Sequence, residues 1–128
     1  MPETETSLAP AVFDQLQKAM ATNKAGFTEL YRDFLADAWH TLRELREAVQ
    51  QQRIEDARDK AHYLKSSCLV LGAREVARQA TRIEELARAS AAIKEIEVEP
   101  IADALCDVQA ELAERLGSGV LPAGKTAA

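Results

Sequence analysis

Several residue types that define common folds and cofactor sites are scarce in this chain of 128 residues. Its two cysteines, Cys68 and Cys106, lack the spacing of a zinc or redox motif. Two isolated cysteines are typical of a reducing cytosol rather than of a disulfide scaffold, although a bridge between them stays open. No apolar run approaches the roughly 20 residues that cross a bilayer, and the polar, acidic start does not resemble a signal peptide. We therefore expect a cytoplasmic protein without a membrane segment.

An excess of positive charge is also missing. The formal net charge is −5, which argues against unassisted binding to nucleic acid, because such binding needs a basic surface. The chain has neither a Gly-rich phosphate loop nor a Walker-type lysine, so no motif indicates a nucleotide site. Hydrophobic residues make up 47% of the chain and charged residues 29%, which favours one domain of helices that each have one solvated face.

Glycine and proline are few, and they separate segments in which apolar residues recur three and four positions apart. This pattern predicts an all-α fold, an antiparallel four-helix bundle with a short additional N-terminal helix. We expect the bundle within residues 8–117, a flexible lead at 1–7 and a disordered tail at 118–128. The predicted helices cover residues 8–20, 27–51, 54–71, 74–89 and 100–116. In the loop before the last helix, apolar side chains should pack against the end of the bundle; these are Ile93, Ile96 and Val98.

The helix at 54–71 carries a histidine on its solvated side. Its apolar residues form one stripe, which consists of Ile54, Ala57, Ala61, Leu64, Cys68 and Leu71. At about 100° per residue, His62 lies about 135° from the centre of that stripe and should face solvent. Its neighbours on the same side are Arg58 and Asp59 one turn before, Lys65 and Ser66 one turn after, and Leu69 two turns on.

These neighbours suit a nucleophilic imidazole. An exposed histidine is largely neutral near pH 7, because its unperturbed pKa is about 6.5. Lys65 can place an ammonium group beside a phosphoryl group on the ring, and the small Ser66 leaves room for a partner. Leu69 adds an apolar side chain to a polar face, as a docking surface does. The same pattern is also typical of an ordinary solvated helix face.

The sequence around the histidine resembles a known signature. Residues 61–73 read Ala-His-Tyr-Leu-Lys-Ser-Ser-Cys-Leu-Val-Leu-Gly-Ala. This segment is similar to histidine-containing phosphotransfer (HPt) domains, in which a His precedes a Leu by two and a Lys by three positions, with small residues and Leu-Gly-Ala downstream. Val76, Ala77 and the segment 83–86 extend the resemblance, which covers about residues 56–88. Ser66 departs from it, because the family most often has Gly directly after the Lys.

The resemblance implies a function and a set of roles. HPt domains take a phosphoryl group from the aspartyl phosphate of one receiver domain and pass it to another, without kinase activity or bound ATP. Accordingly His62 would carry the phosphoryl group through Nε2, and Lys65 would stabilise its charge. Glu84 or Arg88 would orient the imidazole or contact the partner. The candidates for partner contact are Arg58, Asp59, Ser66, Leu69, Glu84 and Arg88.

The same resemblance implies the partners and the metal requirement. We expect response-regulator receiver domains and a hybrid sensor histidine kinase as partners. No resident cofactor or metal is expected, because Mg²⁺ would be held by the receiver. Family members usually act as monomers, and the Met start and the loose tail favour a free-standing protein over part of a hybrid kinase.

Other interpretations of these residues stay open. The chain can be a non-catalytic adaptor that keeps the HPt fold and binds a receiver or kinase without carrying phosphate, and Ser66 is the feature that favours it. It can also be an unrelated helical bundle. Asp59 and His62 have the spacing of a metal pair, but a bundle metal site needs a second pair and inward side chains. For Glu84 a solvated carboxylate is an alternative, and His40 is predicted to lie on the solvated surface.

Overall fold

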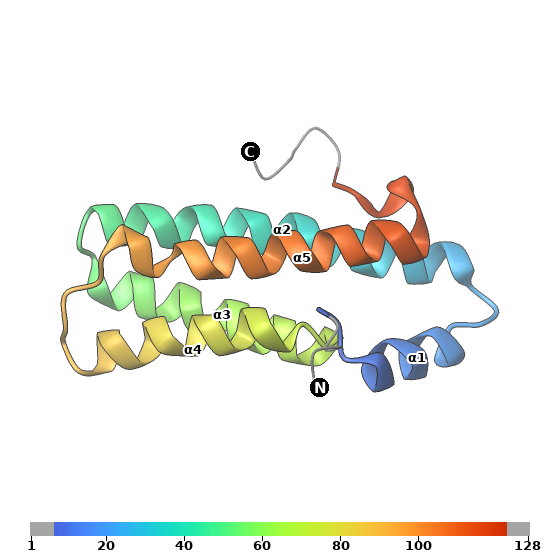
Figure 1. Cartoon of the computed structure of the whole chain (residues 1–128), viewed down its shortest axis with the longest axis horizontal. Helices are drawn as coiled ribbons and strands as arrows, with labels where there is room; N and C mark the ends of the chain where they lie inside the picture. The colour runs from blue at the N-terminus through green and yellow to red at the C-terminus, as the bar shows by residue number, and fades with distance from the viewer. Residues whose placement is uncertain (1–6, 123–128) are drawn as a thin grey trace.

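A computed structural model describes residues 7–122, and every regular element in this range is helical (Figure 1). The predicted range 54–71 agrees with the bounds of the third helix, and the other predicted helices each overlap an observed one. In chain order the elements are α1 (Pro10–Ala19), α2 (Lys24–Gln50), α3 (Ile54–Leu71), α4 (Arg74–Arg88), the 3-10 helix η2 (Glu95–Glu97), α5 (Glu99–Leu116) and the 3-10 helix η3 (Ser118–Val120).

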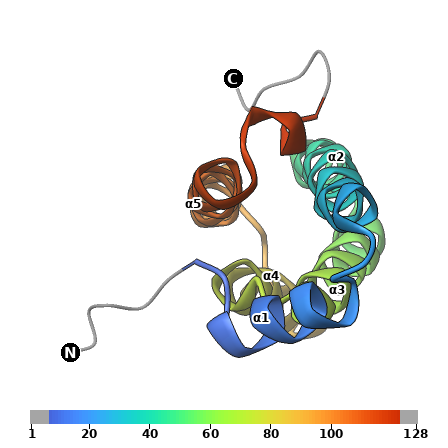
Figure 2. The ribbon, with the colours of Figure 1, turned by 90° about the vertical axis from the view of Figure 1, so that its right-hand side faces the viewer.

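The four long helices form an antiparallel bundle, which confirms the predicted fold class. Seen from the end in Figure 2, α2, α3, α4 and α5 surround a common axis, and α1 lies across the end of α3 and α4. The amide of Ala9 donates a hydrogen bond to the carbonyl of Gly72 at 2.8 Å. The segment before α1 is therefore attached to the turn between α3 and α4.

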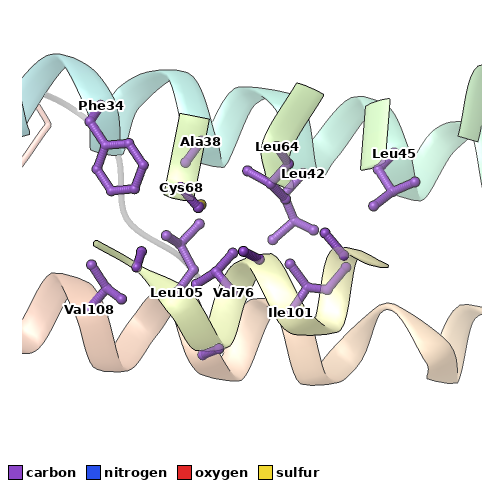
Figure 3. Packing of buried hydrophobic residues seen from close by; sticks show 14 of the residues in the cluster. Phe34, Ala38, Leu42, Leu45, Leu64, Cys68, Val76, Ile101, Leu105 and Val108 are labelled. Atoms are coloured by element: carbon purple, nitrogen blue, oxygen red, sulfur yellow. The ribbon is translucent and has the colours of Figure 1, made fainter. Parts of the chain in front are cut away.

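Apolar side chains at the predicted spacing form the face of α3 that is buried toward the bundle axis. Ala57, Ala61, Leu64, Cys68 and Leu71 are buried, and Ile54 is partly buried against them. Figure 3 shows Leu64 and Cys68 among apolar side chains from α2 and α5. Burial raises the pKa of the Cys68 thiol to about 12, so this cysteine is an inert part of the core. Cys68 and Cys106 are both free thiols.

Gly72 ends α3 and makes the tight turn into α4 possible. Its φ is 89°, in the left-handed region that L side chains rarely adopt. A Cβ at this position would lie 3.1 Å from the Cβ of Val12 in α1. The αα-hairpin of α3 and α4, on which the site is built, thus depends on glycine for both backbone conformation and space.

Two predictions about irregular segments are wrong. The sequence predicts a disordered tail from residue 118, but η3 folds back onto α2 and α5 and Val120 is fully buried. Ile93 and Val98 are buried as expected, whereas Ile96 is exposed on η2. The remainder of the predicted tail, residues 123–128, and residues 1–6 of the predicted lead lie outside the described residues.

Candidate functional site

His62 projects from the outer side of α3, as its phase against the apolar stripe predicts. Its side chain is 62% exposed, so the imidazole is open to a partner. The ring is nevertheless held in place, because Nδ1 lies 2.7 Å from Oε2 of Glu84 on the neighbouring helix α4. One ring nitrogen is thus bound to the protein and the other, Nε2, has no partner among the described residues.

Glu84 is the buried acid of the site, and the alternative of a solvated carboxylate is wrong. Its side chain is only 6% exposed. Oε1 lies 2.9 Å from Nζ of Lys65 and forms an ion pair with it. On the other side, Nη2 of Arg88 lies 3.9 Å from Oε2. One carboxylate therefore contacts His62 and two cations.

The charge state of Glu84 follows from two opposed effects. Burial raises the pKa of its carboxyl, but the contacts with Lys65 and His62 lower it by more, and the pKa lies below its usual value. The carboxylate is consequently ionised at neutral pH and can only accept a hydrogen bond. We assign the proton of a neutral His62 to Nδ1 on this ground, which leaves the Nε2 lone pair free.

The remaining predicted partner residues lie on the same outer side of α3. Arg58, Asp59 and Ser66 are exposed, and no hydrogen bond or ion pair joins their side chains to other described residues. Leu69 is 52% exposed, and the adjacent Val70 is 70% exposed. Leu69 and Val70 form an apolar patch two turns along the helix from His62.

Tyr63, Val70 and Asp37 near the site were missed by the sequence reasoning. Tyr63 follows His62, is half exposed and donates a hydrogen bond to Oδ2 of Asp37 on α2 at 2.6 Å. Tyr63 and Val70 could have been identified from the sequence, because each is an aromatic or apolar residue on the solvated face of a predicted helix. No signal could have identified Asp37, because the pairing depends on how α2 and α3 are aligned.

His40 provides a comparison within the same chain. It is exposed on α2, as predicted, and its Nε2 lies 3.2 Å from Oε2 of Glu44. Glu44 is only partly buried, so His40 lacks the buried acid that holds His62.

Within residues 7–122 no group of three or more His, Cys, Asp or Glu side chains is placed to hold a metal ion. In the same part of the chain, no helix has the length and apolar character that crossing a membrane requires.

Comparison with known proteins identifies the family. A sequence model of the Hpt domain matches residues 29–117, which include most of α2 and all of α3, α4 and α5. The chain belongs to the Hpt domain family. The crystal structure of histidine-containing phosphotransfer protein B from Pseudomonas aeruginosa PAO1 is similar, with a TM-score of 0.78 and 23% sequence identity. The match covers 86% of this chain and 94% of that one, and it shows the shared fold. The search of curated proteins found no significant match.

Membership gives this Hpt protein its general role, histidine phosphotransfer in two-component signalling, with receiver domains and kinases as interaction partners. The match begins within α2, so α1 lies outside it. His62, Lys65 and Glu84 all lie inside the matched range, on the hairpin of α3 and α4.

Proposed function

We propose that this Hpt protein accepts a phosphoryl group on Nε2 of His62 from the aspartyl phosphate of a receiver domain and passes it to another receiver. The observation that carries the proposal is the contact between His62 and Glu84. An exposed imidazole is bound through Nδ1 to a buried, ionised carboxylate, so its nucleophilic nitrogen faces the partner.

The transfer step balances with the groups present. The Nε2 lone pair forms the new P–N bond while the bond between phosphorus and the aspartyl oxygen breaks, and the electron pair leaves with the carboxylate. The ring keeps its Nδ1 proton and becomes positively charged, which the nearby Glu84 carboxylate stabilises. Reversal of the same step delivers the group to a second receiver. Mg²⁺ would be held by the receiver's carboxylates and would offset the charge of the phosphoryl group there.

Cations near the ring offset the charge of the transferred group. Lys65 and Arg88 both contact Glu84 in the unphosphorylated protein. A phosphoryl group on Nε2 adds roughly two negative charges. We expect Lys65 to turn from Glu84 toward the phosphoryl oxygens, while Arg88 stays near Oε2.

A receiver would dock on the outer side of α3, where Ser66 lines the approach to the ring. Leu69 and Val70 would supply apolar contact, and Arg58 and Asp59 would contribute at the edge. A hybrid sensor histidine kinase would supply the first receiver. The protein would act as a monomer in the cytoplasm.

Labelling of the two histidines tests the proposal. The purified protein is incubated with receiver domains that carry a radiolabelled aspartyl phosphate. We expect an acid-labile, base-stable label that His62→Gln abolishes and His40→Gln, the matched control on α2, retains. Label that persists in His62→Gln would contradict the site assignment. Absence of label with every receiver tried, together with receiver binding, would favour the adaptor function instead.

A further inference from the structure

A second polar feature lies beside His62, on the side of α3 that faces α2. A surface cleft of about 280 Å³ lies between residues of the two helices there. For comparison, one water molecule occupies about 30 Å³ in the liquid, so the cleft admits a group of several heavy atoms. Asp59 and Tyr63 line it from α3, one turn before His62 and directly after it.

The cleft is rich in hydrogen-bond acceptors that the protein leaves unused. Asp37 accepts from the Tyr63 hydroxyl through Oδ2, and its Oδ1 has no hydrogen-bond or ion-pair partner among the described residues. The Asp59 carboxylate has no partner among the described residues. Thr41 also lines the cleft and is only 3% exposed, yet its hydroxyl forms no hydrogen bond within the described part of the chain. The hydroxyl oxygen is not closed off from the cleft, so it is available to a polar group that enters there.

The remaining charges of the cleft are already paired. Glu44 contacts Nζ of Lys60 at 3.1 Å through Oε1 and His40 at 3.2 Å through Oε2. The unpaired negative charge therefore comes from Asp37 and Asp59. Carboxylates and a hydroxyl together match a guanidinium group, which has five N–H donors in a fixed fork and no acceptor.

The charges on the surface around His62 are distributed unevenly. The cations Lys65 and Arg88 lie on the α4 side of the imidazole, and the unpaired acids lie on the α2 side. We propose that the cleft between α2 and α3 receives an arginine side chain of the docked receiver, so that the partner can approach His62 in one orientation only. This inference rests on the proposed function, since the receiver brings the arginine.

Binding of a small probe tests the cleft without any phosphotransfer. N-acetyl-arginine amide is titrated into the full-length protein, and amide shifts are followed by NMR. We expect shifts at Asp37, Thr41 and Asp59 that disappear in the double variant Asp37→Asn/Asp59→Asn. The matched control, Asp103→Asn/Glu114→Gln on α5, removes the same charge at exposed positions and should respond like the natural chain. No shift at the cleft, or equal shifts in the double variant, would overturn the inference.

Kinetics with the receiver separate the two proposals. In the cleft double variant we expect the receiver concentration at half-maximal transfer to rise about three- to tenfold, with the maximal rate unchanged and a weaker salt dependence. The α5 control should match the natural chain. If His62 is labelled but the double variant behaves like the control, the cleft inference fails and the proposed function stands. If His62 is never labelled, the proposed function fails, and the arginine titration still decides the cleft.

Discussion

Removal of the buried acid should slow phosphotransfer without preventing it. Glu84 binds Nδ1 of His62 at 2.7 Å and is ionised. Hydrogen bonds to charged groups contribute about 1.5–3 kcal/mol, and neutral ones about 0.5–1.5 kcal/mol. Glu84→Gln can still accept from Nδ1 but lacks the charge, which costs about 1 kcal/mol and slows transfer about fivefold. Glu84→Ala loses both effects, and we expect transfer about ten- to a hundredfold slower.

Single-turnover transfer from a phosphorylated receiver, at saturating concentration, measures this effect on the chemical step. Glu85→Gln is the matched control, because Glu85 is the next residue on α4 and is exposed. Urea unfolding of each variant separates a slow site from an unfolded one. Nitrogen-15 NMR adds a second readout, in which Glu84→Ala should lose the dominance of the Nδ1–H tautomer of His62. An unchanged rate in Glu84→Ala, or an equal loss in Glu85→Gln, would refute the role of Glu84.

Four further perturbations test the docking surface, the fold and the charge of the site. Leu69→Arg should lower transfer efficiency at least about tenfold with an unchanged urea midpoint, since Leu69 is exposed, and an unaffected efficiency would exclude it from the receiver contact. Gly72→Ala should destabilise the protein by about 1–2 kcal/mol in urea unfolding, because its φ is 89° and Val12 leaves little room for a Cβ. Val120→Ala should cost about 1–2 kcal/mol in the same assay, whereas a disordered tail predicts no change. The pKa of Glu84 is lower in the folded state than in the unfolded chain, so its stabilising contribution is complete above the unfolded pKa and is lost as the pH falls through the folded pKa. The difference in unfolding free energy between the natural chain and Glu84→Gln should therefore shrink from about pH 7 to about pH 3. A constant difference would show that Glu84 is not held ionised.

The position of His62 could be predicted from the sequence because it depends on one helix only. The apolar residues of α3 recur three and four positions apart, and their phase directs His62 outward. The end of α3 was predictable for a similar reason, since Gly72 adopts a backbone conformation that glycine favours. The exposure of Leu69 follows in the same way from the advance of about 100° per residue along α3.

Features that depend on two helices could not be obtained in this way. Glu84 is buried because the α3–α4 hairpin brings it under His62 and Lys65, and periodicity within α4 alone leaves a solvated carboxylate equally plausible. The pairing of Tyr63 with Asp37 depends on the alignment of α2 and α3. The sequence predicts a disordered tail from residue 118 because the Ser, Gly and Pro of residues 118–122 resemble a linker, whereas Val120 occupies a buried position against α2 and α5.

The central claim is that Nε2 of His62 carries the phosphoryl group, and NMR of the phosphorylated protein tests it most directly. Coupling between phosphorus and the ring nitrogens of isotope-labelled histidine identifies both the residue and the atom. The account predicts a single phosphorus signal coupled to Nε2 of His62, with the Nδ1 proton still present. Phosphorus on Nδ1 of His62 or on His40, or no phosphohistidine after incubation with phosphorylated receivers, would contradict it.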